Sequence, residues 1–358
     1  MNFSTYHSRE RLRRNRIVPD EITDHQHRFH EKSMSKEPVN PLISVVITNF
    51  NGKHFLHDCI PALLRQEDYS PLEIIMVDNA SDDGSVDYVQ QNFPGVKIFV
   101  QPTNLGFAGG TNAGIREAKG TYILTLNNDT VVSPGFIRQL VQPMLSDPTV
   151  GMCASKMILP DGRINTTGIC ISRSGAAWDR GMNETDHGQY ESGGEVFGPS
   201  AGAALYRRAM LDETGLFDED FFLFMEDVDL AFRARLAGWK CIYVPAARVI
   251  HMHGGSAQTG SDLAVYYGNR NIIWNVFKNY PWKLLLASLP FVICRNAGVI
   301  PYYALRGQWR VIIRAKFDAI KGLRSMVKKR GGIKKKVADH EIAQWIQTWG
   351  FRERRDKI

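Results

Sequence analysis

Short apolar runs alternate with amphipathic segments from residue 41 onward. The apolar runs are rich in β-branched residues, end in turn-forming residues and are expected to be buried strands; they cover 42–50, 72–78, 96–101 and 121–126. Helical spacing of apolar residues is found between them, at 54–66, 86–93 and 111–119, and a glycine-rich loop is expected at 104–114. This alternation predicts an α/β fold with a mostly parallel sheet, of the kind that forms nucleotide-binding domains.

The pattern is weaker in the middle of the chain. From Pro134 to Gly194 it predicts only loops with short strands. Clear periodicity returns at 224–239, which predicts a helix, and the apolar run at 240–256 predicts a strand that ends in two histidines. A helical, aromatic-rich region follows from about residue 262.

The C-terminal part combines an apolar run with a basic segment. Residues 284–305 are apolar over about the length of a membrane span, but Pro290, Arg295 and Pro301 interrupt them, which favours interfacial helices over one clean transmembrane helix. Residues 306–336 hold twelve Lys or Arg and one acidic residue. This charge predicts an anionic partner, either a membrane surface or a nucleic acid.

Length and composition describe a folded protein of enzyme size. The 358 residues are 44% hydrophobic and 23% charged, which are ordinary globular values. Five scattered cysteines without a C-x-x-C pair indicate neither a disulfide framework nor a zinc site, so a reducing, cytoplasmic setting is expected. The N-terminus lacks the apolar core of a secretory signal. We expect a flexible lead-in at 1–40, a main α/β domain at 41–282 and a helical, apolar and basic region at 283–358.

Polar and acidic residues stand where two of the predicted strands end. Asp78 ends one strand, and Asn127-Asn128-Asp129 follows another. In open α/β sheets, ligands bind in the crevice outside the carboxyl ends of the strands, so these side chains are candidates for a nucleotide site. A capping role in the following turn is the alternative for each acid taken singly.

An acidic pair and a histidine pair extend this set. Glu226 and Asp227 begin a predicted helix, where the helix dipole alone favours acids, although a paired carboxylate is also a way to obtain a general base. His251 and His253 follow a predicted strand. With Asp129 as an oxygen donor, His251 is a candidate ligand in a mixed nitrogen and oxygen site for Mn²⁺ or Mg²⁺.

Six segments, in order along the chain, resemble motifs of the family 2 glycosyltransferases with the GT-A fold. They are ISVVITNFNG, EIIMVDNASDDGS, NLGFAGGTNAGI, TLNNDT, GLFDEDFFLFMEDVDLAFR and HMHGGS. The resemblance runs from about residue 42 to 282 and points to the bacterial rhamnosyltransferase-like branch and its galactofuranosyltransferase relatives. It implies the transfer of a sugar from a nucleotide-sugar donor to a hydroxyl of a glycan or lipid-linked acceptor, with inversion at the anomeric carbon.

The resemblance also implies where the donor binds. The ends of the first two strands would hold the nucleobase, and the glycine-rich segment would line the ribose and the diphosphate. The implied donor-binding residues are Thr48, Asn49, Asp78, Asp83, Asn104, Gly106, Asn112, Asn127 and Asn128. From the branch, dTDP-rhamnose is the first expectation for the donor and a UDP-sugar the second.

A metal site and a catalytic base follow from the same resemblance. Asn127-Asn128-Asp129 matches the D-x-D motif, in which the last Asp binds a divalent cation, and His251 matches a further metal ligand. Because Asn127 replaces the first acid, this site carries less charge and we expect a lower metal affinity. Asp227 matches the catalytic base, and Glu226 lies beside it.

Two other functions stay open on the sequence. One is a protein that binds an anionic surface through its basic tail and has a degenerate catalytic domain, although residues 42–255 resemble no nucleic-acid module. The other is a nucleotidyltransferase, although the segment after the first strand offers only Asn51, Gly52 and Lys53 in place of a basic, glycine-rich phosphate loop. We favour a glycosyltransferase of polysaccharide synthesis that is peripheral on the inner face of the cell membrane and binds no nucleic acid.

Overall fold

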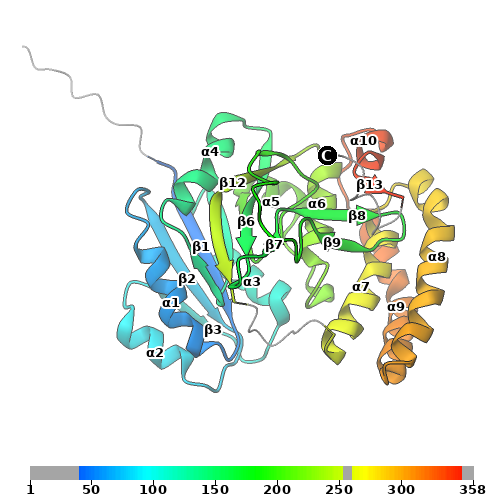
Figure 1. Cartoon of the computed structure of the whole chain (residues 1–358), viewed down its shortest axis with the longest axis horizontal. Helices are drawn as coiled ribbons and strands as arrows, with labels where there is room; N and C mark the ends of the chain where they lie inside the picture. Colours follow the sequence, from blue (N-terminus) through cyan, green and yellow to red (C-terminus); the bar gives the residue numbers. More distant parts are fainter. Residues whose placement is uncertain (1–39, 253–259, 349–358) are drawn as a thin grey trace, which may run out of the picture. The chain divides into compact units, whose positions relative to one another are not determined.

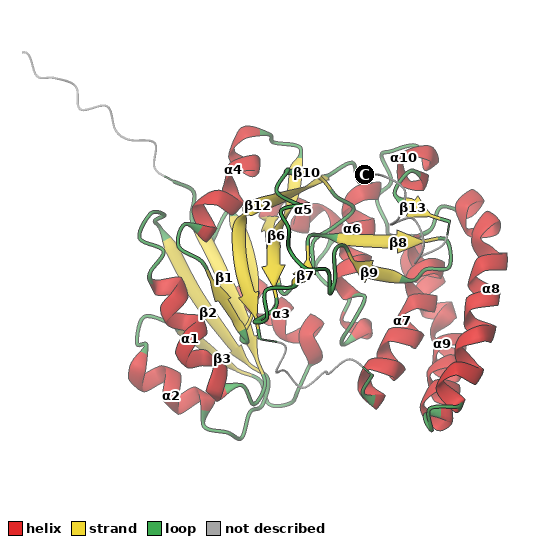
Figure 2. Cartoon of the chain, in the orientation of Figure 1, coloured by secondary structure: helices red, strands yellow, loops and turns green. Residues whose placement is uncertain are grey.

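The computed structural model describes residues 40–252 and 260–348, so the expected lead-in and His253 lie outside the described residues. A mixed sheet of ten strands forms the centre of this part (Figures 1 and 2). Its strands are β1 (Ile43–Asn49), β2 (Leu72–Asp78), β3 (Lys97–Val100), β4 (Tyr122–Asn127), β5 (Thr130–Val132), β6 (Val150–Ile158), β7 (Ile164–Thr166), β10 (Gly194–Glu195), β11 (Ala203–Arg207) and β12 (Lys240–His251). A smaller sheet consists of β8 (Ile169–Ser172), β9 (Ala177–Asp179) and β13 (Ile346–Gln347).

Helices flank the large sheet and form the C-terminal part. They are α1 (Lys53–Leu64), α2 (Ser85–Asn92), α3 (Gly106–Glu117), α4 (Phe136–Ser146), α5 (Arg208–Thr214), η1 (Glu219–Phe221), α6 (Glu226–Leu236), α7 (Asp262–Asn279), α8 (Trp282–Ala304), α9 (Trp309–Arg330) and α10 (Asp339–Ala343). In Figure 1, α7, α8 and α9 run beside one another at the end of the molecule opposite to α1 and α2.

The four strands predicted in the first half of the chain form the parallel part of the large sheet. Their order is β4, β1, β2, β3, and all three pairings are parallel. Beyond β4 the sheet is mixed, because β11 lies antiparallel between β4 and β6 while β12 is parallel to β6. The mixed α/β architecture agrees with the predicted fold class, and the parallel pairing is confined to its first half and the β12–β6 pair.

Alternate residues of β1 pack on two different helix layers. Val45 belongs to a core with α1 and α4, whereas Val46 belongs to a core with α3 and α6. Both side chains are almost fully buried. A strand covered on both faces reads as a continuous β-branched run, which is why ISVVITN is recognisable without any polar alternation.

The glycine-rich segment is mainly a helix, so the predicted loop at 104–114 is wrong over most of its length. Helix α3 begins at Gly106. A Cβ atom on Gly114 would lie 2.4 Å from Val46 Cγ1, and one on Gly110 would lie 2.7 Å from Thr48 Cγ2. These glycines therefore allow α3 to approach β1 closely, rather than lining a phosphate loop.

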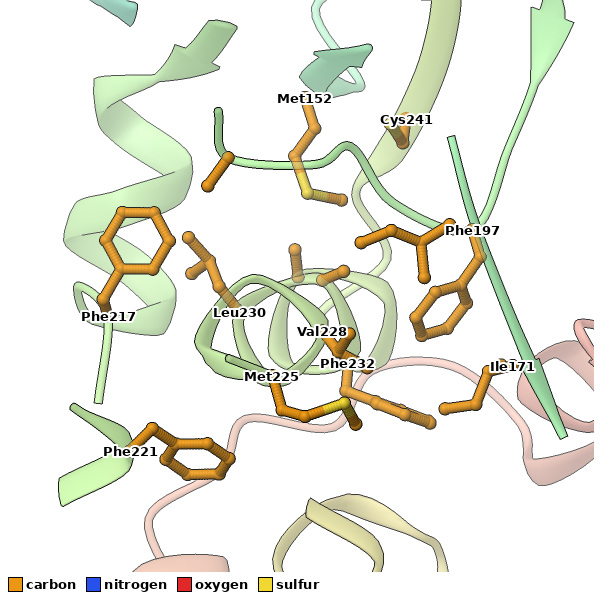
Figure 3. Close-up of a cluster of buried hydrophobic side chains, with 14 of the residues drawn as sticks. Met152, Ile171, Phe197, Phe217, Phe221, Met225, Val228, Leu230, Phe232 and Cys241 are labelled. Carbon is orange, nitrogen blue, oxygen red and sulfur yellow. The ribbon is translucent and has the colours of Figure 1, made fainter. Parts of the chain in front are cut away.

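Helix α6 is buried along almost its whole length. Figure 3 views it end-on, with Val228, Leu230 and Phe232 directed into the surrounding apolar core. Asp229 on the same helix is also buried and pairs with Arg233 (2.8 Å). The i,i+4 pair is thus part of the interior, and it holds in place the helix that carries Glu226 and Asp227 on its first turn.

The weakly patterned middle of the chain contains two long elements. Helix α4 and the nine-residue strand β6 both lie between 134 and 194, where only loops and short strands were expected. Helix α4 contains Pro143, a residue that usually predicts the end of a helix. Strand β6 is buried on both faces and carries Ser and Lys among its apolar residues. Periodicity alone does not separate such a strand from a loop.

The C-terminal apolar run forms one continuous helix, which corrects the expected interruption. Pro290, Arg295 and Pro301 all lie inside α8. Within the described residues, α8 is the one helix that is long and apolar enough to cross a membrane, and 17% of its apolar 18-residue stretch is buried. Helix α9 packs along α7, and Lys329 pairs with Asp220 (2.7 Å). The basic segment is therefore anchored on the main domain along one side.

Candidate active site

A cavity of about 780 Å³ opens where β1 and β4 end. Its walls come from the β1 end, the α3 start, the turn after β4, the β8–β9 hairpin, the segment before α6, and α7. Nine of the residues singled out from the sequence lie in these walls: Thr48, Asn104, Gly106, Asn127, Asn128, Asp129, Glu226, Asp227 and His251. The topology thus brings together residues that are more than 200 positions apart.

Strand pairing places His251 beside Asp129. The end of β12 pairs with β5, with His251 opposite Thr130 in the register. As a result, His251 Nε2 lies 3.1 Å from Asp129 Oδ1 and 3.3 Å from Asn127 Nδ2. Asp129 is 4% exposed, so this carboxylate faces the cavity from a largely buried position.

A second contact orients the histidine ring. His251 Nδ1 lies 2.8 Å from Asn165 Oδ1 on β7, and an amide oxygen can only accept a hydrogen bond, so the proton is on Nδ1. Nε2 is then the ring nitrogen that faces the Asp129 carboxylate, and in its unprotonated form it can bind a cation. Metal-binding histidines are usually held in this way, with the second ring nitrogen bound to an oxygen acceptor.

The two side chains fit a divalent cation as adjacent ligands. Ligands at about 2.1 Å in an octahedral sphere place neighbouring donor atoms about 3.0 Å apart, and the Nε2–Oδ1 separation is 3.1 Å. In residues 40–252 and 260–348, no group of three or more His, Cys, Asp or Glu is arranged to hold a metal. The described residues therefore offer a two-ligand set, which a bound ligand with anionic oxygens could complete.

Asn128 is supported from behind by residues that were expected to touch the donor. Its Nδ2 donates to Asn49 Oδ1 (2.7 Å), and Asn49 Nδ2 donates in turn to Asp78 Oδ1 (3.0 Å). Asp78 also accepts from the backbone N–H of Ser81 (2.9 Å). Asn49 and Asp78 are fully buried and are not among the wall residues of the cavity, so they hold Asn128 and the adjoining turn in position.

The side of the cavity near α3 is lined by polar groups. Thr48 Oγ1 contacts Thr111 Oγ1 (2.9 Å), and Asn104 Oδ1 accepts from the Gly106 N–H (2.8 Å). Asn79, which sequence reasoning missed, donates to the Gly106 carbonyl (2.9 Å), and its own side-chain oxygen is buried without a partner among the described residues. This wall presents uncharged hydrogen-bonding groups, as a nucleoside would require.

Two predicted donor residues have other contacts in the structure and are not wall residues. Asn112 makes a reciprocal pair of hydrogen bonds with the backbone of Phe217 (2.8 and 3.0 Å), which ties α3 to the segment before η1. Asp83 accepts from the Lys53 N–H (2.8 Å) and from Ser85. Partial burial raises the pKa of Asp83, but the hydrogen bonds together outweigh burial, so the pKa is lowered overall.

The adjacent acids at the start of α6 have different surroundings. Glu226 is 5% exposed, and its Oε2 has no hydrogen-bond partner among the described residues. Burial, and then the neighbouring Asp227 charge, raise the pKa of Glu226 well above its usual range. Asp227 is half-buried and accepts from the backbone N–H groups of Val228 (2.7 Å) and Ala201 (3.4 Å). Burial also raises the pKa of Asp227, and these hydrogen bonds partly offset that effect.

A strained segment leads into these acids. Phe222, Phe224 and Met225 have φ values of 64°, 64° and 70°, which bulky residues rarely adopt. Asn271 on α7 is fully buried and donates to the carbonyls of Phe221, Leu223 and Phe224 (2.7–2.9 Å). Sequence reasoning missed Asn271, because one polar residue on a helical stripe gives no sign that it holds an active-site loop.

Asp179 is a further acid of the cavity that the sequence did not reveal. It lies at the end of β9, in the smaller sheet. Burial, and then the charge of Asp227, raise the pKa of Asp179 to about 6, against the opposing effects of Thr166 and His251. No strand end in the main sheet marks this residue, and only the packing of the hairpin over the cavity brings it to the site.

Comparison with known proteins shows which family this chain is similar to. Residues 44–215 match the model of the family described as Glycosyl transferase family 2. The N-acetylglucosaminyl-diphospho-decaprenol L-rhamnosyltransferase of Mycobacterium tuberculosis is 29% identical over 303 residues, which cover 78% of this chain and 97% of that protein. These similarities confirm the resemblance to family 2 glycosyltransferases of the rhamnosyltransferase-like kind.

Solved structures agree on the fold. GalNAc-T7, crystallised with UDP, GalNAc and Mn²⁺, superposes with a TM-score of 0.55 at 19% identity, over 68% of this chain and 48% of that one. Residues 1–349 of TarS from S. aureus superpose with a TM-score of 0.50 at 15% identity, over 84% of this chain and 91% of that one. The predicted GT-A fold is thereby confirmed. The chain is an enzyme, and its residues 44–215 are similar to the family 2 glycosyltransferases.

Proposed function

We propose that the protein is an inverting glycosyltransferase that moves rhamnose from dTDP-rhamnose to a hydroxyl of a lipid-linked sugar. The observation that carries the proposal is that the Asp129–His251 pair and the Asp227 carboxylate line the same cavity. The pair suits a diphosphate with its cation, and the carboxylate suits a hydroxyl that must lose a proton. The mycobacterial relative is named for a rhamnosyl transfer to a diphospholipid-linked sugar, which supports this choice over a UDP-sugar.

Asp129 and His251 would hold Mn²⁺ or Mg²⁺ in this proposal. Their separation suits adjacent ligands, and the contact with Asn165 keeps His251 Nε2 facing the site. A cation bound there neutralises charge on the departing diphosphate. Asn127 adds a neutral amide beside the pair, so the protein contributes one negative charge where a D-x-D site contributes two, and we infer a weaker metal site.

The donor would bind along the wall that begins at β1. Thr48, Asn104 and Gly106 are wall residues, and Asn128 is fixed by Asn49. We infer that Thr48 and Asn104 contact the nucleoside, whereas Asn49, Asp78, Asp83 and Asn112 act by holding the wall in shape. This division modifies the sequence expectation, in which all of them touched the donor.

Asp227 would act as the general base. An acceptor hydroxyl gives its proton to the Asp227 carboxylate while its oxygen forms a bond to the anomeric carbon. The bond between that carbon and the diphosphate oxygen breaks, and the nucleoside diphosphate leaves with the electron pair. Attack and departure occur on opposite faces of the sugar, so the configuration inverts without a covalent intermediate. Glu226 is buried beside the base, and burial together with the Asp227 charge raises its pKa well above its usual range, which favours the protonated form and makes it a poor second base.

We further propose that α8 and α9 attach the enzyme peripherally to the inner face of the membrane, where a lipid-linked acceptor is presented. Large apolar side chains are exposed on both helices, including Leu286 (64%), Phe317 (66%) and Ile320 (67%). Exposed cations of α9, such as Arg314 and Arg324, lie along the same helix. Apolar insertion together with cationic attraction is the combination that gives stable binding to anionic lipid.

The membrane proposal is tested on the full chain, because α9 packs on α7 and its removal would expose the core. The variant Phe317→Asp/Ile320→Asp should lose most of its co-sedimentation with phosphatidylglycerol vesicles. The matched control Val100→Asp changes an exposed apolar residue on β3 and should pellet like the wild type. Equal pelleting of all three proteins would contradict the membrane assignment.

Calorimetry with a panel of sugar nucleotides tests the donor. We expect dTDP-rhamnose to bind in the presence of Mn²⁺ and to bind much more weakly after the metal is removed by chelation. A preference for UDP-sugars would show that the proposed donor is wrong, but it would not affect the proposed reaction class. Failure of every sugar nucleotide to bind would contradict the proposed function.

A further inference from the structure

Two separate sheets build the cavity, and they carry acids of different kinds. The large sheet supplies Asp129 and His251, the proposed cation site. The smaller sheet contributes the β8–β9 hairpin, in which Asp179 pairs in register with Ile169, and both residues line the cavity. The hairpin therefore forms a wall that belongs to neither the nucleotide strands nor the cation site.

Asp179 takes part in none of the ion pairs that Lys or Arg side chains form in residues 40–252 and 260–348. Burial raises its pKa, and the neighbouring His251 lowers it in part. Its hydrogen-bond partner is the neutral Thr166, and the acid that acts on it electrostatically is Asp227. Two carboxylates that share a cavity repel each other, and neutral hydrogen-bond donors placed between them relieve that repulsion.

A role for Asp179 as a metal ligand is not supported by the geometry. It lies near enough to interact electrostatically with His251, but the described residues contain no group of three acids, histidines or cysteines that could hold a metal. A carboxylate close to a general base is best suited to bind the hydroxyls of a sugar, because these groups donate hydrogen bonds and carry no charge.

We propose that Asp179 binds the acceptor, accepting a hydrogen bond from a hydroxyl adjacent to the one that Asp227 deprotonates. This inference rests on the proposed function, because it takes Asp227 as the base. It identifies the β8–β9 hairpin as the acceptor wall. It also defines the acceptor class as a sugar with two neighbouring free hydroxyls, of which one is glycosylated and the other is held by Asp179.

Kinetics of the Asp179→Asn variant test this role, with a synthetic N-acetylglucosaminyl diphospholipid as acceptor and dTDP-rhamnose as donor. A hydrogen bond to a charged group contributes enough binding energy that the acceptor KM should rise about 10- to 100-fold. The Kd of dTDP-rhamnose and its slow hydrolysis without acceptor should stay within about twofold of wild type, because the donor site is untouched. Asp161→Asn, an exposed acid outside the cavity walls, is the matched control.

Monodeoxy analogues of the acceptor sugar give a second measurement that does not depend on the stability of a variant. Wild type should lose affinity for one analogue that remains a substrate, and Asp179→Asn should not distinguish that analogue from the parent acceptor. An unchanged acceptor KM in the variant would overturn the inference. Weaker binding of dTDP-rhamnose with normal binding of dTDP would also overturn it, by assigning Asp179 to the donor sugar. A wild type that binds and hydrolyses no sugar nucleotide would overturn the proposed function as well.

Discussion

Replacing Asp227 by asparagine removes the proposed base while keeping the shape of the side chain. The Asp227 carboxylate accepts a short hydrogen bond from Val228 N–H (2.7 Å) and a long one from Ala201 N–H (3.4 Å). An asparagine can keep the first with its oxygen, whereas its amide nitrogen cannot accept from the Ala201 N–H, so only the longer and weaker of the two hydrogen bonds is lost. The local structure should therefore survive, and a change in rate can be assigned to lost proton transfer.

The expected loss follows from the usual contribution of a positioned general base. Such groups accelerate reactions by about 10²- to 10⁴-fold, which corresponds to about 3–5 kcal/mol of transition-state stabilisation. We expect kcat to fall by this factor in Asp227→Asn, with the Kd of the sugar nucleotide within about threefold of wild type. Release of the nucleoside diphosphate measures the rate, and calorimetry measures donor binding.

Glu226→Gln is the matched control for the lost charge. Burial and the Asp227 charge raise the pKa of Glu226 well above its usual range, which favours the neutral side chain, and its Oε2 has no hydrogen-bond partner among the described residues to lose. The rate of this variant should stay within about threefold of wild type. A large loss in Glu226→Gln with a small one in Asp227→Asn would make Glu226 the base and refute this reasoning.

The pKa of Asp227 adds two readouts. Because burial raises the pKa of Asp227, kcat/KM should begin to fall on acidification at a higher pH than it would if the base were an exposed aspartate. Between the unfolded and folded pKa values the folded state binds more protons, so stability decreases as pH rises through that window. Asp227→Asn removes this penalty, and its Tm at neutral pH should exceed that of wild type although its activity is lost.

Three further predictions concern the metal pair, the loop before α6 and the buried ion pairs. Asp129→Ala should abolish the Mn²⁺-dependent part of donor binding in calorimetry without changing Tm by more than a few degrees; undiminished binding would remove Asp129 from the metal site. Asn271→Ala removes a donor from three loop carbonyls, of which, among the described residues, only that of Phe221 keeps another donor, Arg270. The variant should cost about 2–4 kcal/mol in urea unfolding as well as lowering kcat, whereas a loss in kcat alone would contradict its role in stability. Burial alone would raise the pKa of Asp229, but the charges of Arg233 and Lys278 lower it to about 2. The stability that the ionised Asp229 adds should therefore be lost as pH falls from about 4 to about 2. In Asp229→Asn, Tm should change less with pH in this range. An unchanged dependence of Tm on pH would show that the ion pairs of Asp229 do not stabilise the fold.

The motifs that hold the candidate site residues were predictable because each is local. A strand buried on both faces is visible as a β-branched run, and the polar residues that follow it, such as Asn127 to Asp129, are visible because they end that run. Glu226 and Asp227 stand at a helix start, where their spacing is set by one turn of chain. The family, the fold class and the main catalytic candidates therefore follow from the sequence alone.

Tertiary structure decided which of these residues share the cavity and which only support it. Asn49, Asp78 and Asn112 are predicted donor-binding residues, and in the structure they are buried and hydrogen-bonded to other residues instead of lining the cavity. His251 reaches Asp129 only through the pairing of β12 with β5. Such pairing depends on register between distant strands, which local pattern does not encode.

Sequence reasoning did not find Asp179 or Asn271, and the physical reason is the same for both. Neither lies at a strand end of the nucleotide-binding half or in a recognisable motif, and each gains its position from the packing of one element on another. The hairpin places Asp179 against the cavity, and α7 places Asn271 under the strained segment. Hydrophobic patterning determines that these elements form, whereas the polar residue that meets the active site is determined by how they pack.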